Sequence, residues 1–276
     1  QFSFDTYAPR YNSGVGLMVF KDEQGINAIS SYKIVGQYSY ELRLNSRYSL
    51  RAGLEGGFQQ INVNYENLPS WFNNEGLVNR GSEGSFNKMF PDIGSGLIFY
   101  DRNLWLSTSF HHLNRPNQGF IRDPLYIKFT VSGGYKIPIS LGAPASSRGL
   151  HAAPDLIFLT PTFTYKNQGP NDQVDLGLYF TRKWFISGVW YRGIPFKRYD
   201  TNIQNNESVV FLVGASYQGL GFGYSYDLTV STQTFRTGGA HELNLTYVFN
   251  VRRRKGPQKQ LPCPDFEYEI LDKAGR

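Results

Sequence analysis

The sequence predicts an all-β protein whose strands form a transmembrane antiparallel β-barrel of about 14 strands. Apolar and polar residues alternate with a period of two along most of the chain, which is the pattern of strands with two different faces. Aromatic residues make up 16% of the chain, including 19 Tyr and 21 Phe, and there are 29 Gly. This mixture is rich in strand and turn formers. Mean hydropathy is −0.40, which a barrel tolerates because only alternate residues must be apolar.

The last hairpin, residues 219–250, carries the clearest alternation. Its two limbs place large apolar residues on one face and small, polar or acidic residues on the other, and Gly238 and Gly239 supply the turn. The apolar set is Leu220, Phe222, Tyr224, Tyr226, Leu243, Leu245, Tyr247 and Phe249. One face of this hairpin is therefore expected to meet lipid and the other a polar interior.

The rest of the chain divides into similar segments. We expect strands over residues 1–7, 14–20, 30–44, 48–62, 91–100, 104–113, 125–137, 155–166, 174–182, 184–194 and 208–217. Most are near the 9 to 11 residues that a tilted strand needs to cross a bilayer. No run of 18 apolar residues occurs, which excludes a membrane-spanning helix.

The connections alternate in length, as in bacterial outer-membrane barrels, with tight turns in the periplasm and long loops outside. Tight turns are expected at 45–47, 101–103, 182–183 and 218–219, and long loops at 64–90, 114–124, 195–207 and 230–238. The longer connection at 138–153 is the exception. By this parity the C-terminus is periplasmic. The strand count is thirteen, whereas such barrels have even numbers, so we expect that the first strand is absent from this chain.

We divide the chain into a barrel, residues 1–250, and a periplasmic C-terminal tail, residues 251–276. The tail is expected to order on a periplasmic partner because it combines basic residues with apolar ones in an extended pattern. Its candidate contact residues are Arg252, Arg253, Arg254, Leu261, Cys263, Pro264, Phe266 and Tyr268. A charged stop at the membrane surface is the alternative. The single cysteine rules out an internal disulfide framework.

Charged residues fall on the faces opposite the apolar residues. The candidates for the lumen or its rim are Glu41, Arg43, Arg51, Glu55, Asp227 and Glu242, together with Lys128 and Asp175. On the lipid side each would cost roughly 2 to 4 kcal/mol at mid-depth. Because acids and bases are interleaved, a lumen cross-braced by ion pairs is favoured over an ion-selective pore.

Three aromatic residues in the longest outer loop, Trp71, Phe72 and Phe86, form a candidate partner-binding set. Aromatic residues are enriched at binding hot spots. The same residues could instead fold the loop onto the mouth of the barrel, and the sequence leaves both readings open.

The residues point to no catalytic or metal site. His111 and His112 are adjacent, so on a strand they would face opposite ways and could not share a metal. Ser225, Asp227 and His241 could come close across the last hairpin, but His241 has the parity of the outer face. An outer-membrane hydrolase is therefore disfavoured. A soluble β-sandwich is disfavoured as well, because it would leave too many aromatic faces in water.

Five segments in order resemble the PorP/SprF family of Bacteroidota outer-membrane proteins. They are GVGLMVFKDEQG from residue 14, YSLRAGLEGGF from 48, PDIGSGLIFY from 91, GYSYD from 223 and GGAHELNLTY from 238. The resemblance implies a non-enzymatic barrel without cofactors, associated with type IX secretion and gliding motility. It would anchor or position a secreted surface protein, or adhesin, or a machinery component. An outer-membrane channel or solute transporter is the alternative.

Overall fold

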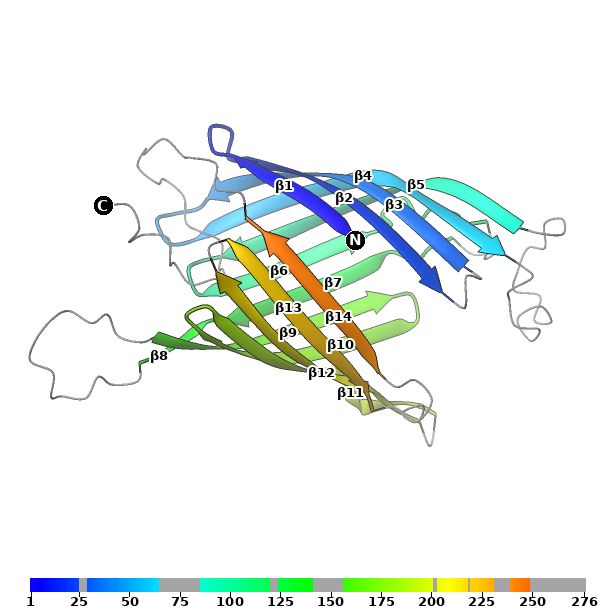
Figure 1. Ribbon diagram of the computed structural model, residues 1–276. Helices are drawn as coiled ribbons and strands as arrows, with labels where there is room; N and C mark the ends of the chain where they lie inside the picture. Colours follow the sequence, from blue (N-terminus) through cyan, green and yellow to red (C-terminus); the bar gives the residue numbers. More distant parts are fainter. Residues whose placement is uncertain are drawn as a thin grey trace, which may run out of the picture.

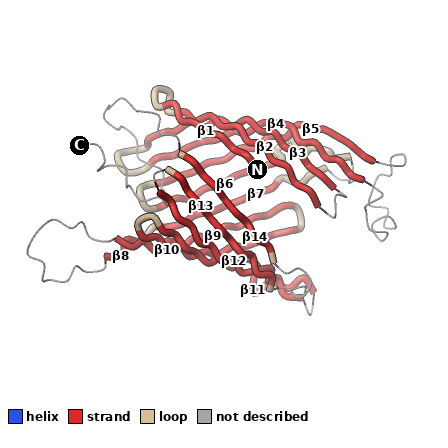
Figure 2. Tube along the Cα trace, in the orientation of Figure 1, coloured by secondary structure: helices blue, strands red, loops and turns tan. Residues whose placement is uncertain are grey.

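The computed structural model describes residues 1–24, 29–64, 85–119, 124–140, 156–200, 203–217, 219–230 and 239–248 (Figure 1). In these ranges every regular element is a strand (Figure 2). Among the described residues there is no helix long and apolar enough to cross a membrane.

The strands lie in the following bounds. They are β1 Phe2–Ala8, β2 Ser13–Gln24, β3 Ile29–Arg43, β4 Ser49–Asn64, β5 Ser85–Tyr100, β6 Leu104–His111, β7 Lys128–Tyr135, β8 Ile137–Ser140, β9 Leu156–Gln168, β10 Asn171–Arg182, β11 Phe185–Asp200, β12 Ile203–Tyr217, β13 Leu220–Thr229 and β14 Ala240–Tyr247.

All fourteen strands belong to one antiparallel sheet, in which strands that are consecutive along the chain are neighbours. The exception is β8, which pairs with β9 alone. Gly134 of β7 lies opposite Thr162, and Ile137 of β8 lies opposite Leu159, so both short strands keep one register against β9. β7 and β8 therefore follow one another along the same side of β9 and together count as one strand of the wall. The sheet is thus thirteen strands wide, which is the number counted from the sequence.

The sheet curls on itself to make the wall of a β-barrel (Figure 1). The antiparallel all-β fold expected from the alternation is confirmed. The wall is not closed, because no pairing joins β1 to β14 within the described part of the chain.

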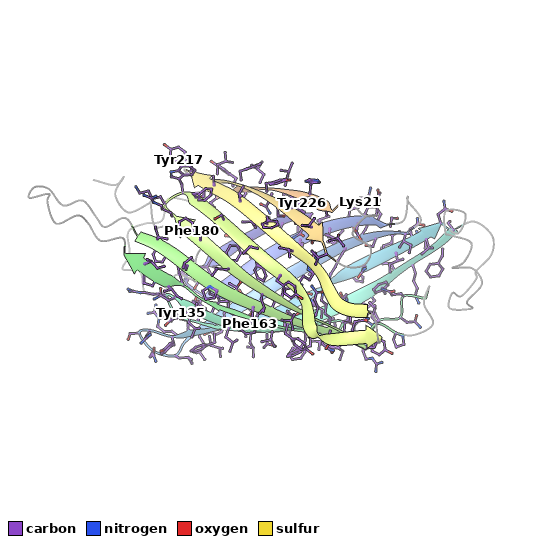
Figure 3. The ribbon with its side chains drawn as sticks, turned by 90° about the horizontal axis from the view of Figure 1, so that it is seen from below. Lys21, Tyr135, Phe163, Phe180, Tyr217 and Tyr226 are labelled. Carbon is purple, nitrogen blue, oxygen red and sulfur yellow. The ribbon has the colours of Figure 1, made fainter. Side chains whose placement is uncertain are left out.

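The two faces of the wall differ as the alternation requires. Leu54, Leu243 and Leu245 point outward, with 63%, 75% and 74% of their surface exposed, whereas Val35 on the inner face is 1% exposed. Figure 3 shows side chains standing on the outer surface, among them Phe163 and Tyr217. An apolar surface of this extent is unfavourable in water and favourable against hydrocarbon.

Several strands run further than their sequence pattern indicated. Residues 85–90, expected in a long loop, form the first part of β5. The region 195–207, also expected as a loop, is mostly strand, since β11 extends to Asp200 and β12 begins at Ile203. A register shift follows Arg192, where Gly193 has a φ of 134°. A bulge interrupts the alternation on which the prediction rested.

A small apolar cluster lies between β4 and β5. Ile61, Val63 and Phe90 are buried there, and Ile29, Phe86 and Leu125 pack against them. Phe86 was expected in the outer loop. It lies instead on β5 and packs in this cluster, so the long-loop prediction for Phe86 is wrong.

The tight turn between β5 and β6 is organised by one carboxylate. Asp101 Oδ1 accepts hydrogen bonds from the backbone N–H groups of Asn103 and Leu104, both at 2.7 Å. Its Oδ2 lies 3.3 Å from Arg47 Nε, in the turn between β3 and β4. Asp101 therefore shapes its own turn and joins two neighbouring hairpins.

The first prediction concerns the two faces of the barrel wall, of which only the outer one is exposed to lipid. Leu54→Arg, on the outer face of β4, should lower the free energy of unfolding in lipid vesicles by roughly 2 to 4 kcal/mol. Gln37→Arg, on the inner face of β3 beside Glu55, is the control and should change it by less than about 0.5 kcal/mol. Equal effects of the two substitutions would contradict the assignment of the faces.

The Asp101 turn predicts a pH dependence. Burial alone would raise the pKa of this carboxyl, but the N–H groups of Leu104 and Asn103 and the Arg47 guanidinium outweigh burial and lower it. The contact therefore stabilises the folded protein at pH values above about 3.9, the ordinary pKa of an aspartate. This stabilisation is lost as the pH falls through the lower pKa that Asp101 has in the folded state.

Asp101→Ala should accordingly cost about 1 to 2 kcal/mol at neutral pH and less at acid pH. Urea unfolding at several pH values measures the difference, with Arg102→Ala in the same turn as the control. A deficit that stays constant down to pH 3 would argue against the charged contact.

Candidate functional site

The inner face of the barrel carries a row of ionisable side chains from most of the strands between β3 and β13, which we call the charge girdle. The pairing register places each of its members on the face opposite the exposed apolar residues. The girdle consists of Lys33 of β3, Glu55 of β4, Asp92 of β5, His111 of β6, Lys128 of β7, Lys166 of β9, Asp175 of β10, Arg192 of β11 and Asp227 of β13.

In the first part of the girdle a lysine lies between two carboxylates. Lys33 Nζ is 3.1 Å from Asp92 Oδ2 and 3.8 Å from Glu55 Oε1. The Glu55 carboxylate also contacts His111 Nδ1 at 2.7 Å. Asp92 is 3% exposed. A carboxylate so enclosed needs these partners to remain charged.

His112 joins the same cluster. Its Nδ1 lies 2.9 Å from Asp92 Oδ1, on the inner side of the wall. Strand β6 ends at His111, and His112 has a φ of 59°, so the backbone leaves the strand conformation there. The prediction that the two histidines face opposite ways is therefore wrong, because it assumed that the strand continued.

In the second part of the girdle two acids alternate with two bases. Lys166 Nζ lies 2.8 Å from Asp175 Oδ2, and Arg192 Nη1 lies 2.8 Å from Asp227 Oδ2. Arg192 Nε is 3.6 Å from Asp175 Oδ1, so the arginine links β10 to β13. Gln173 Nε2 donates to Asp175 Oδ1 at 2.7 Å.

A separate ion pair, between Arg51 and Glu41, lies nearer the short turns. Arg51 Nη2 is 2.8 Å from Glu41 Oε2, and the Tyr7 hydroxyl lies 3.3 Å from the same oxygen. The guanidinium also stands over the rings of Tyr7 and Tyr100, at 5.5 and 5.8 Å from their centroids. Arg51 thus holds β1, β3, β4 and β5 together.

All these ion pairs join strands that are neighbours or next neighbours in the sheet. The described ion pairs therefore connect strands along the wall of the barrel. We had expected them to connect opposite sides of the wall across the lumen. The interleaving of acids and bases was predicted correctly. The direction of the contacts could not be, because it depends on strand tilt and register.

Aromatic side chains fill the inner face nearer the short turns. A Cβ atom on Gly134 would lie 2.3 Å from the Trp105 ring, and one on Gly177 would lie 2.5 Å from the Trp190 ring. Ring atoms of Trp105 and Trp190 therefore occupy the space that a side chain would need at these positions, which only glycine leaves free. Tyr179 packs edge-on against Trp190 at 5.7 Å.

The inner face is polar, and part of it is closed to solvent. Among the described residues, eight of its polar or charged side chains are buried, namely Glu41, Ser49, Asp92, Thr160, Thr162, Asp175, Thr181 and Ser208. A cavity of about 330 Å³ remains along the inner side of β1 to β6, and its lining includes Tyr7, Gln37, Arg51, Glu55 and His111.

The other predicted rim residues lie at the ends of strands or at the edge of the sheet. Arg43 is the last residue of β3 and is exposed. Glu242 of β14 is exposed and accepts a hydrogen bond from Ser225 Oγ at 3.3 Å. Trp71, Phe72 and the whole tail, Arg252, Arg253, Arg254, Leu261, Cys263, Pro264, Phe266 and Tyr268 included, lie outside the described residues.

Ser225, Asp227 and His241 do not come together as a catalytic group, because His241 lies on the opposite face from the other two. His241 lies opposite Tyr226 on the outer face, and its Nδ1 is 2.8 Å from the Tyr224 hydroxyl. Ser225 and Asp227 share the opposite face with Glu242 and Ala240. Within the described ranges, no group of three or more His, Cys, Asp or Glu side chains could hold a metal ion.

The second part of the girdle yields a prediction. Arg192→Met removes the partner of Asp227 and should lower the free energy of unfolding by about 1 to 3 kcal/mol, a range reduced because a third of the arginine side chain is exposed. Arg43→Met is the matched control and should cost less than about 0.5 kcal/mol. Chemical unfolding in lipid vesicles compares them, and equal losses would argue against bracing by the girdle.

Comparison with known protein families agrees with the geometry. The family model for the type IX secretion system membrane protein PorP/SprF matches residues 1–247, which include every described strand. No curated protein matches the chain. The chain therefore belongs to the PorP/SprF family of type IX secretion system membrane proteins.

Proposed function

We propose that this protein is a non-enzymatic outer-membrane barrel that anchors or positions a type IX-secreted surface protein, such as an adhesin, or a component of the secretion or gliding machinery. The observation that carries this proposal is the buried, polar inner face. Eight polar side chains of that face are closed to solvent, whereas an aqueous channel leaves its polar lining in contact with water.

The long-loop end is the surface that would receive the secreted partner. Loops carry binding function when a rigid scaffold positions them. Here the scaffold is the wall braced by Lys33, Asp92 and Glu55, whose contacts join β3, β4 and β5. Trp71 and Phe72 follow β4 in the longest connection and supply aromatic side chains of the kind found at binding hot spots.

The tail would act at the opposite membrane surface. With short turns in the periplasm, the C-terminus is periplasmic, and Leu261, Phe266 and Tyr268 would order on a periplasmic component of the machinery. The basic run Arg252 to Arg254 would lie next to the membrane surface.

The loop assignment is tested by Trp71→Ser/Phe72→Ser. We expect the barrel to remain in the outer membrane at its normal level while the secreted partner is lost from affinity purification in mild detergent. Mass spectrometry identifies the partner, and surface labelling of intact cells measures it. Full retention of the same surface partner by this variant would contradict the assignment.

Deletion of residues 261–276 is the matched counterpart. It should leave the surface partner bound and remove a periplasmic one, so that failure of either half of the proposal can be recognised separately. An unchanged set of periplasmic proteins would remove the tail from the account.

Conductance discriminates the anchor from the channel. The purified barrel in a planar bilayer should be electrically silent, because eight polar side chains of its inner face are buried against the wall. A steady large conductance would instead favour a channel or solute transporter.

A further inference from the structure

The edge of the wall at the short turns, which we call the basic edge, carries charge of one sign. It comprises the turns after β1, β3, β5, β10 and β12 and the adjoining strand ends. Among its described residues Asp101 is the only acid, and it is 5% exposed. Seven cations lie there, all but Lys136 exposed, namely Arg10, Arg43, Arg47, Arg102, Lys136, Arg182 and Lys183.

The opposite edge of the wall is mixed in sign. There Lys21 forms an ion pair with Glu23 on β2, and Asp172 lies at the start of β10 after a tight turn. Arg115, beyond the end of β6, is exposed. The excess of cations among the described residues therefore belongs to the short-turn edge.

The turn between β10 and β11 places two of these cations on the outside of the wall. Arg182 is the last residue of β10 and shares a face with Leu176 and Leu178, which are exposed on the outer surface. Lys183 follows it in the turn, with a φ of 52°. Both side chains are exposed.

Exposed aromatic rings lie directly beside these two cations. Trp184 is 54% exposed, and its ring meets that of Phe185 edge-on at 6.2 Å. The backbone N–H of Ser216 donates to Trp184 O at 2.8 Å, which fixes the turn against the end of β12, where Tyr217 stands on the outer surface (Figure 3). Aromatic rings in such positions mark the interface between lipid and water, so the cations lie at the level of the lipid headgroups.

The same combination recurs at the turn between β3 and β4. Arg47 Cζ stands 5.2 Å from the centroid of the Tyr48 ring, which stacks on Phe99 of β5 at 5.3 Å. Arg47 also contacts Asp101, yet 71% of its side chain is exposed. Cations and aromatic rings therefore meet at turns that are separated around the wall by β4 to β10. This distribution suits the lipid that surrounds a barrel better than one protein surface docked on one side.

We propose that the basic edge binds the headgroups of anionic phospholipids, with its principal site at the turn between β10 and β11. Arg182 and Lys183 contact the headgroup phosphate, and the rings of Trp184 and Phe185 lie beside the upper part of the acyl chains. The site is independent of the proposed anchoring function, because it concerns only the outside of the wall.

The first test titrates the complete chain in detergent micelles with phosphatidylglycerol or phosphatidylcholine and counts bound lipid by native mass spectrometry. Phosphatidylglycerol should bind at least about fivefold more tightly, because one cation beside an anionic lipid contributes roughly that factor. Equal binding of the two lipids by the unaltered protein would overturn the proposal and leave the basic edge to an acidic protein surface.

The site itself is tested by Arg182→Gln/Lys183→Asn, in which asparagine is chosen because it tolerates a positive φ. Its affinity for phosphatidylglycerol should fall by about fivefold or more, while its affinity for phosphatidylcholine stays unchanged. Lys21→Gln/Arg115→Asn is the matched control, since it removes two cations from the opposite edge, one of them at a φ of 46°. Equal losses in the two variants would refute the location of the site.

A second measurement guards against misfolding. In vesicles of phosphatidylcholine alone, the unaltered protein and both variants should unfold at the same temperature. Added phosphatidylglycerol should raise that temperature in the unaltered protein and in the control, and raise it less in Arg182→Gln/Lys183→Asn. If the double variant does not fold, Lys183→Asn alone is compared with Arg115→Asn. High salt should abolish the difference between the lipids, and a preference that persists there would contradict recognition by charge.

Discussion

The structure depends on the separation of two environments by one layer of backbone. Every strand has to present apolar side chains to hydrocarbon on its outer face and polar side chains to the interior on its inner face. The period of two in the sequence makes this possible. Leu243 and Glu242 are adjacent in the chain and lie on opposite faces of β14. The same rule places Leu54 outside and Glu55 inside on β4. Shifting a strand by one residue would reverse both faces, so the hydrophobic pattern also fixes the register.

The polar groups on the inner face have to find hydrogen-bond and ion-pair partners within the barrel. The charge girdle and the Arg51 cluster do so by joining neighbouring strands, and Trp105 and Trp190 cover glycines on adjacent strands. The wall of this membrane protein of the type IX secretion system therefore carries its own bracing. Lys128 departs from this arrangement, since the residues opposite it on the two neighbouring strands are His111 and Gln168, neither of which is an acid.

The all-β fold, most of the strand positions and the faces of nearly all the charged residues could be predicted from alternation, because that pattern is local. The fate of His112 could not, since a single left-handed residue at the end of β6 returns its side chain to the inner face. Phe86 was misplaced because the polar composition of residues 64–90 hid the start of β5. The partners of Arg192 and Lys33 follow from register and tilt, which no short stretch of sequence contains. The five motifs that resembled PorP/SprF identified the family correctly, because they occur in order between the beginning and the end of the matched residues.

The most direct test of the account is the environment of alternate residues in the last hairpin. Single cysteines can be placed at Phe222, Leu245, Ser225 and Thr246 in a Cys263→Ser background, labelled with a fluorophore and reconstituted in vesicles containing lipids with brominated acyl chains. The account predicts strong quenching at Phe222 and Leu245, which point outward, and little at Ser225 and Thr246, which point inward. Equal quenching at all four positions, or the reverse order, would contradict it.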